Sequence, residues 1–253
     1  MLDIKDLSVK IRGKTVVRNL TLSLPPGKIT ALIGESGSGK SMTVAALLNV
    51  LPVGSEVTGS AELNGRELLN IQDEKLASQH RQQVFTIFQD ALNSFNPSLK
   101  MKKQLYQFSG KKMGDSFPVF KGRMREILKN LELSPEIMEQ YPFELSGGML
   151  QRCMIACAVY VKASVLIADE PTSSIDMLIK KEFISLLKRL NEGGTTVLLI
   201  THDLDVALEA ADHLAVIHKG EVVETGELAV VIAQAQHAYT KKLLDSSFRL
   251  QER

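Results

Sequence analysis

The 253-residue sequence contains no tryptophan, two cysteines and few aromatic residues of any kind. All 9 Phe and 4 Tyr residues lie at or after Phe85, and this scarcity disfavours an aromatic platform for stacked bases or sugars. The chain also lacks an excess of charge of either sign, because 30 Lys and Arg against 29 Asp and Glu leave a net charge of +1. We therefore expect no nucleic-acid partner.

Long apolar runs are absent as well. The longest conspicuous one, Cys153–Val161, has nine residues, whereas a membrane helix needs about 20. The first residues carry charges at Asp3 and Lys5 and no apolar segment, so we expect no signal peptide, no transmembrane span and a cytosolic chain. Cys153 and Cys157 would share one face of an apolar helix, which favours small core residues over metal or redox chemistry.

Strand signals dominate the first third of the chain. Apolar and polar residues alternate over Leu7–Ile11 and Leu20–Leu24, and Ile29–Ile33 is an apolar run interrupted only by Thr30. The alternation is typical of half-buried strands, and the apolar run is typical of a buried central strand. Asn64-Gly65 predicts a β-hairpin.

Helical signals replace them between residues 90 and 162, with amphipathic stretches at Arg123–Leu131 and Met149–Val161. Apolar strands at Val165–Ala168 and Thr195–Ile200 then alternate with helices. This pattern predicts an α/β core with an inserted helical subdomain. We expect three parts: residues 1–89 with a β subdomain, the helical part 90–162, and the remainder of the core, 163–253.

The stretch GESGSGKS fits the phosphate-loop pattern GxxxxGK[ST] between a predicted strand and a predicted helix. Backbone N–H groups of such a loop surround a polyphosphate at the helix N-terminus. Lys40 would reach the β and γ phosphates, and Ser41 would offer its hydroxyl to Mg²⁺. This context disfavours a chance glycine-rich turn. The predicted nucleotide-binding residues are Gly34, Glu35, Ser36, Gly37, Ser38, Gly39, Lys40, Ser41 and Met42.

Two adjacent carboxylates, Asp169 and Glu170, follow the apolar strand Val165–Ala168. Asp169 would hold Mg²⁺ through water, and Glu170 would polarise the attacking water. By itself the pair could equally be a solvated strand end. The phosphate loop upstream favours the catalytic interpretation.

The stretch LSGGMLQR at Leu145–Arg152 resembles the LSGGQ signature of ATP-binding cassette (ABC) ATPases. Other motifs of that family occur in order: Gln89 at the Q-loop, Ser173–Asp176 at the D-loop, and His202 at the switch histidine. The resemblance spans about residues 2–244. It implies the ABC ATPase fold, a RecA-like P-loop core with an antiparallel β subdomain and an inserted helical subdomain.

The resemblance also implies an ATPase that uses ATP and Mg²⁺, and it assigns roles residue by residue. The implied catalytic residues are Glu170, His202 and Gln89. The implied Mg²⁺ ligands are Ser41, Gln89 and Asp169. Ser146, Gly147 and Gly148 would act in trans on the γ-phosphate held by a second cassette, with Asp176 in the D-loop.

Two positions depart from the family pattern. Met149 replaces the usual signature glutamine, at a position that varies among importers. The family places an aromatic residue against adenine near positions 11 and 12, where this chain has Ile11 and Arg12. Arg12 could stack on the base through its planar guanidinium or be a solvated turn residue; the sequence leaves both open.

Four stretches resemble the peptide/nickel importer subfamily: the residues around Gln89, Asn93–Pro97, Tyr141–Arg152 and His237–Leu244. Its oligopeptide members often carry a cysteine-bearing tail, and no cysteine follows Cys157 here. The resemblance therefore favours import of nickel or a metal chelate over a di- or oligopeptide.

The implied partners are a second ATPase subunit of a different chain, two transmembrane permeases and an extracellular solute-binding protein. The implied location is the cytoplasmic face of the cell membrane. Alternatives are a non-transport ABC ATPase of the translation or DNA-repair type and a binding-only ATP sensor. A P-loop kinase would lack the signature.

Overall fold

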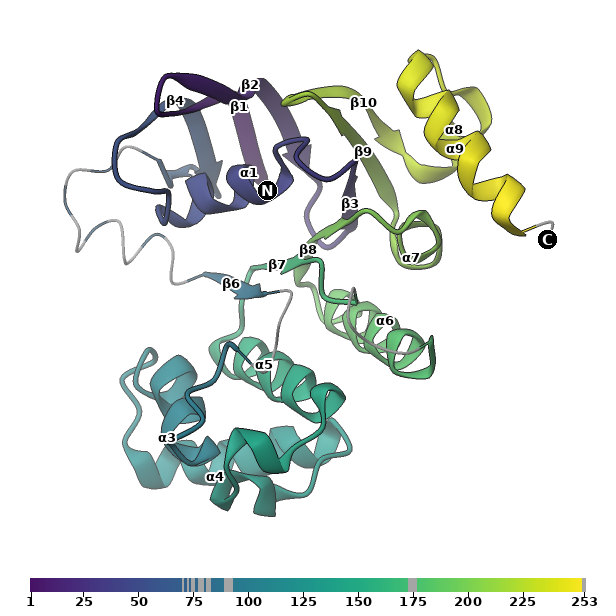
Figure 1. Ribbon diagram of the computed structural model, residues 1–253. Coiled ribbons are helices and arrows are strands. Elements are labelled where there is room, and N and C mark those ends of the chain that lie inside the picture. Colours follow the sequence, from purple (N-terminus) through teal and green to yellow (C-terminus); the bar gives the residue numbers. More distant parts are fainter. Residues whose placement is uncertain are drawn as a thin grey trace.

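The computed structural model describes residues 1–69, 71, 73, 76, 80, 83–88, 93–172 and 177–251. Two sheets build the upper part of the molecule (Figure 1). The smaller sheet is antiparallel, with strand order β2-β1-β4-β5. Its strands are β1 (Leu2–Ile11), β2 (Lys14–Leu24), β4 (Ser55–Leu63) and β5 (Arg66–Glu67). β4 and β5 form the hairpin predicted at Asn64-Gly65.

The larger sheet has the order β10-β9-β3-β8-β7-β6, and only β10 runs antiparallel to its neighbour. Every residue of β3 and of β8 is buried, which explains why threonine is their only polar residue type, because both faces of the sheet are covered. The strands are β3 (Ile29–Ile33), β6 (Val84–Ile87), β7 (Val165–Asp169), β8 (Thr196–Thr201), β9 (His213–His218) and β10 (Glu221–Glu227).

Helices cover both faces of this sheet. Helix α1 (Lys40–Leu48) packs with the antiparallel sheet against one face, where Leu32, Leu198 and Ile200 point. Helices α7 (Leu204–Ala210), α8 (Leu228–Gln234) and α9 (Ala238–Gln251) lie at the side of the sheet that ends in β9 and β10. α1 ends at Leu48, because Asn49 adopts a left-handed C-cap.

A helical unit occupies the lower part of Figure 1 and contains no strand in the described part of residues 93–162, as predicted. It comprises α3 (Met101–Leu105), the π-helix η1 (Tyr106–Gly110), α4 (Phe117–Asn130), the 3-10 helices η2 (Pro135–Glu139) and η3 (Pro142–Glu144), and α5 (Gly147–Val161). Ser134 caps η2, because its side chain accepts the N–H of Glu136. The division into three parts at residues 89 and 162 stays a prediction.

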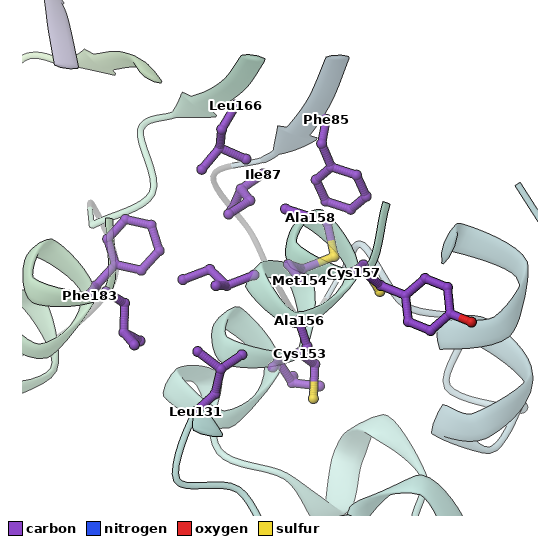
Figure 2. Close-up of a cluster of buried hydrophobic side chains, with 14 of the residues drawn as sticks. Phe85, Ile87, Leu131, Cys153, Met154, Ala156, Cys157, Ala158, Leu166 and Phe183 are labelled. Carbon is purple, nitrogen blue, oxygen red and sulfur yellow. The ribbon is translucent and has the colours of Figure 1, made fainter. Parts of the chain in front are cut away.

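One apolar cluster joins this unit to the larger sheet (Figure 2). Leu166 and Phe85 extend from the sheet, Phe183 comes from α6 (Met177–Glu192), and residues of α5 lie among them. Burial of such side chains contributes about 1.5–3 kcal/mol each. The signature helix is therefore packed directly against the sheet that carries the acidic pair.

Cys153 and Cys157 lie inside this cluster and are fully buried, as predicted. Burial raises the pKa of Cys157 to about 12 and that of Cys153 further still, so both remain thiols. Across the residues described, no three His, Cys, Asp or Glu side chains are grouped as metal ligands. Nor does any helix in that part of the chain have the length and apolar character needed to cross a bilayer.

Two glycines give a matched test of the packing of the helical unit. A Cβ on Gly110 would lie 2.6 Å from Tyr106 Cδ2 and 2.8 Å from Phe120 Cδ2, whereas a Cβ on Gly122 would meet nothing within 4 Å. We expect Gly110→Ala to destabilise the protein by about 1–3 kcal/mol through overpacking. Gly122→Ala, in the exposed middle of α4, should stabilise it by up to about 1 kcal/mol. Equal midpoints in urea unfolding would contradict this packing.

Candidate nucleotide site

The predicted site residues from three separate sequence regions meet at one edge of the parallel sheet. The phosphate loop follows β3, the acidic pair ends β7, and His202 follows β8. β3 pairs with β8 and β8 with β7, so the carboxyl ends of all three strands lie side by side. Ligands of open α/β sheets bind at this edge.

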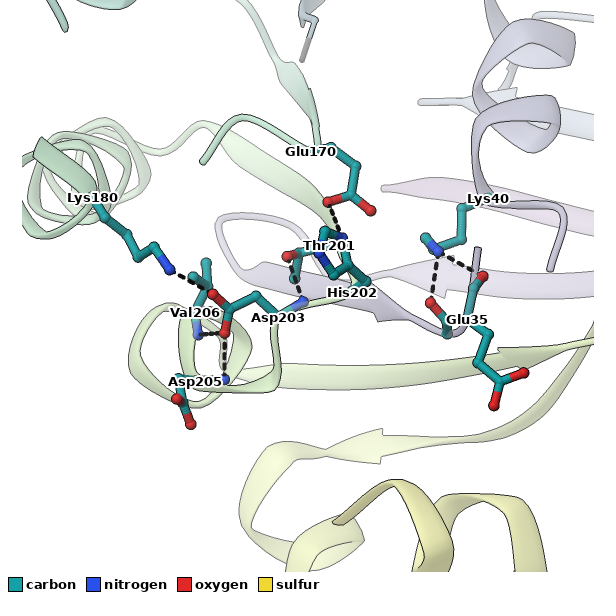
Figure 3. A network of polar contacts seen from close by, with 10 residues as sticks. Glu35, Lys40, Glu170, Lys180, Thr201, His202, Asp203, Asp205 and Val206 are labelled. Carbon is teal, nitrogen blue, oxygen red and sulfur yellow. Dashed lines mark hydrogen bonds and ion pairs between the residues drawn. The ribbon is translucent and has the colours of Figure 1, made fainter. Parts of the chain in front are cut away.

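Backbone geometry shapes the phosphate loop. A Cβ on Gly34 would collide with the carbonyl oxygen of Ile217, and Gly39 has a φ of +111°, so both positions require glycine. Lys40 Nζ donates to the carbonyls of Gly34 at 2.6 Å and Glu35 at 3.0 Å (Figure 3). Burial lowers the pKa of Lys40, while Glu170 and Asp169 act in the opposite direction. The ammonium group is thus held where a bound polyphosphate would need it.

Asp169 and Ser41 form the part of the site that fits Mg²⁺. Ser41 hydrogen-bonds the Asp169 carboxylate, and burial together with Glu170 raises the pKa of that carboxyl. Asp169 Oδ1 is buried and has no hydrogen-bond partner among the described residues. A buried carboxylate oxygen beside a hydroxyl is a donor set that suits a hard divalent cation. Mg²⁺ bound here would neutralise charge on the phosphates.

Glu170 and His202 form a direct contact at the mouth of the site. His202 Nδ1 lies 2.7 Å from Glu170 Oε2, and Figure 3 shows the two side chains pointing at each other. The Glu170 side chain is 14% exposed and that of His202 60%. Glu170 also has a φ of +48°, a costly conformation for a non-glycine residue. A carboxylate and an imidazole in this arrangement can hold a water molecule and accept its proton.

Asp203 fixes the segment that carries His202. Its carboxylate accepts the N–H groups of Asp205 and Val206 as the N-cap of α7, and Lys180 Nζ lies 2.6 Å away. Burial alone would raise the pKa of Asp203, but Lys180 and the backbone hydrogen bonds outweigh it and lower the pKa. No motif in the sequence points to Lys180, whose partner is 23 residues away.

A cavity of about 740 Å³ contains most of these groups. Arg12 is not among its lining residues: it is exposed in the turn between β1 and β2, with a φ of +50°. Its proposed contact with adenine stays a prediction. Sequence reasoning missed two apolar residues that do line the cavity, Val16 and Leu243. The lining residues are Val16, Gly34, Glu35, Ser36, Gly37, Gly39, Lys40, Ser41, Met42, Glu170, His202 and Leu243.

The signature residues lie outside this cavity. Ser146 caps α5 by accepting the N–H of Met149 at 3.3 Å, and Gly147 is exposed with open space around it. Gly148 is half-buried on the same first turn. A helix N-terminus of this kind favours a phosphate group, but the same chain's phosphate loop does not meet it. Gln89 and the D-loop, with Asp176, lie outside the described residues.

The fold and site define a P-loop nucleotide-binding protein, and comparisons with known proteins define its family. The family model described as "ABC transporter" matches residues 17–173. The oligopeptide transport ATP-binding protein OppD of Salmonella typhimurium is 36% identical over 259 residues, covering 99% of this chain and 77% of that protein. OppD of Bacillus subtilis is 34% identical over 255 residues, covering 97% and 71%.

Solved structures agree in fold. CbiO1 of Clostridium perfringens, part of the transporter complex CbiONQ, superposes with a TM-score of 0.80 at 23% identity, covering 100% of this chain and 98% of that one. The cassette MJ0796, in a post-hydrolysis state bound to ADP and Pi, gives 0.72 at 26% identity, covering 90% and 99%. This chain belongs to the ABC transporter family. It is an ATP-binding subunit of that family and an ATPase.

The Glu170–His202 contact predicts a separation of binding from hydrolysis. Glu170→Gln keeps the size of the side chain but removes the charge that polarises water. We expect ATP binding to persist while turnover falls by about 100-fold or more. Phosphate release and equilibrium ATP binding measure the two effects. The matched control is Glu209→Gln, an exposed position on α7; full turnover in Glu170→Gln would reject the assigned role.

The burial of Asp169 predicts a trade-off between stability and function. Because its pKa is raised in the folded state, the ionised carboxylate destabilises the protein without Mg²⁺ at neutral pH. Asp169→Asn should therefore raise the melting temperature, by about 2–4 °C for each 1 kcal/mol removed, while weakening Mg²⁺-dependent ATP binding.

The pH dependence of the melting temperature tests whether the buried, ionised carboxylate of Asp169 causes the difference. As the pH falls to the raised pKa, wild-type Asp169 takes up a proton and its disadvantage disappears. The gap in melting temperature between wild type and Asp169→Asn should then narrow. Asp245→Asn, at an exposed carboxylate, should show no such gap. A gap that widened towards low pH would contradict the assigned burial cost.

Proposed function

We propose that the chain is the motor subunit of a solute importer and works as one of two paired cassettes. The observation that carries the proposal is the separation of two half-sites within one chain. The cavity around Lys40 and Glu170 lacks the signature, while Ser146 and Gly147 are exposed at a phosphate-favouring helix end elsewhere. A second cassette placed head to tail would bring the two halves together.

In the proposed reaction, the phosphate loop and Lys40 bind the ATP phosphates, and Ser41 and Asp169 hold Mg²⁺, with Gln89 as a further ligand. Glu170 takes the proton of the attacking water, and His202 keeps the Glu170 carboxylate oriented. The signature of the partner cassette, Ser146 to Gly148, would donate backbone N–H groups to the γ-phosphate. Donors fixed in advance at developing charge stabilise the transition state.

Closure of the two cassettes would be transmitted to membrane permeases through the segment that follows Gln89. A ligand can drive such a change only when it binds one state better than the other. ATP meets that requirement, because its γ-phosphate would contact both cassettes only in the closed pair. The proposed assembly has two transmembrane permeases and an extracellular solute-binding protein, and this chain lies against the cytoplasmic face of the membrane.

Two cargo classes are in question. The relatives named above are described as oligopeptide transport proteins, and a further relative, YejF of Agrobacterium fabrum, as a peptidoglycan transport protein. Their descriptions favour a di- or oligopeptide. The resemblance of the motifs in this sequence favours nickel or a metal chelate. The shared proposal is import of a small solute, and uptake measurements separate the two classes.

The alternatives from the sequence predict other results. A translation or DNA-repair ATPase would not co-purify with permeases. A binding-only sensor would show no turnover, which the contact of Glu170 with His202 disfavours.

The test uses Gly147→Asp in the complete complex. Gly147 is exposed at the first position of α5, and a Cβ added there would have no atom within 4 Å, so an aspartate fits and suits the helix N-terminus. Its charge would repel a γ-phosphate presented by the partner. We expect normal assembly with the permeases and normal ATP binding in the chain's own loop. Coupled hydrolysis and uptake of labelled peptide or nickel should fall at least tenfold.

Gly122→Asp, exposed on α4 away from the signature, is the control for added charge. Unchanged uptake in Gly147→Asp would reject action of the signature in trans. Uptake of neither solute class by the wild-type complex would reject the importer assignment.

A further inference from the structure

The last helix of the chain, α9, reaches the phosphate loop. The hydroxyl of Tyr239, on its first turn, accepts a hydrogen bond of 3.0 Å from the backbone N–H of Glu35, although 204 residues separate the two. Leu243, one turn further along α9, lines the nucleotide cavity. Residues at i and i+4 share one face of a helix. α9 therefore presents one face to the site.

Tyr239 is held firmly in this position. Its ring stacks on His218 at the end of β9, with ring centroids 4.0 Å apart, and only 8% of the residue is exposed. Upstream of α9, Glu224 of β10 accepts the backbone N–H groups of Gln236 at 2.7 Å and His237 at 3.2 Å. Because these contacts tie Tyr239 and the start of α9 to the sheet, the hydroxyl is a fixed point for the loop.

The contacted end of the loop is also the end that binds Lys40. The carbonyls of Gly34 and Glu35 bind Lys40 Nζ, and Lys40 lines the same cavity as Glu170 and His202. Leu243 also packs against the apolar cluster that contains Leu204, two residues after His202. Tyr239 thus contacts the end of the loop that holds Lys40, and Leu243 lines the same cavity.

A second hydrogen bond from outside the phosphate loop fixes the middle of the loop. The N–H of Gly220, in the turn between β9 and β10, donates to the carbonyl of Ser38 at 2.9 Å. The loop backbone is therefore fixed from outside at two points. Backbone N–H groups that bind phosphates act through their orientation, so a small shift of the loop costs affinity and rate.

We propose that Tyr239 is a positioning residue of the ATP site. Through Glu35 it sets the place of the loop entrance and of the Lys40 ammonium group, and it thereby selects for the γ-phosphate. Leu243 forms the apolar wall at the same end of the cavity. The proposal deepens the proposed function and rests on ATP being the substrate of this site.

The decisive variant is Tyr239→Phe in the Glu170→Gln background, where ATP is not consumed. Phenylalanine keeps the stacking on His218 and removes only the hydroxyl. We expect the dissociation constant for ATP to rise about three- to tenfold, the loss typical of one hydrogen bond, with the constant for ADP unchanged. Leu243→Ala should likewise raise the dissociation constant for ATP and leave that for ADP unchanged. Lys242→Ala, at an exposed neighbour on α9, should change neither constant.

The ratio of the ATP and ADP constants distinguishes positioning from general stability, because a merely structural role of Tyr239 would weaken both nucleotides or neither. An unchanged ratio in Tyr239→Phe, with an unchanged melting temperature, would overturn the proposal. Absence of ATP binding in the parent Glu170→Gln protein would instead reject ATP as the substrate. The measurement needs no permease or cargo, so its result is independent of the importer assignment.

Discussion

The architecture depends on one constraint: the central strands of the parallel sheet are buried on both faces. β3 and β8 have no exposed residue, so they can carry no polar chemistry along their length without a large desolvation cost. Polar function is confined to the strand ends. The parallel order brings the ends of β3, β7 and β8 to one edge, and that edge collects the phosphate loop, the acidic pair and His202.

The same burial that stabilises the sheet is costly where the chain leaves it. Lys40 is buried and binds two loop carbonyls, and Asp169 has a buried oxygen without a partner among the described residues. Glu170 adopts a left-handed backbone conformation. These are the features a nucleotide with Mg²⁺ would compensate, and proteins tolerate such costs where function requires them. The free energy released on binding would then be available to hold the loop and the carboxylates in one arrangement.

The sequence predicted the parts of the fold that local pattern controls. The strand predicted at Ile29–Ile33 is correct to the residue, because a short apolar run between a turn and a glycine-rich loop is typical of a buried strand. The end of α1 depends on the left-handed backbone of Asn49, which no apolar pattern encodes. The motif residues of the loop and acidic pair met as expected, because each follows a strand of the same sheet.

Contacts between segments that are distant in the sequence could not be predicted from any motif or periodicity. Tyr239, Leu243 and Lys180 reach the site across turns and helices whose packing no periodicity encodes. Arg12 was a candidate only because a resemblance placed a base-binding residue near it, and the turn leaves it exposed. The motifs therefore predicted where their own residues lie in the fold, and they left out the neighbours that the tertiary structure supplies.

The two half-sites are also linked inside the chain. Gln151, on the second turn of the signature helix, is 4% exposed and donates to the carbonyl of Pro171 at 2.5 Å. Pro171 directly follows Glu170, so one buried hydrogen bond connects the helix that carries Ser146 with the loop that carries Glu170. A shift of α5 against the sheet must stretch this bond or move the loop with it. The proposed engagement of the signature by a second cassette would consequently act on the position of Glu170 in the first.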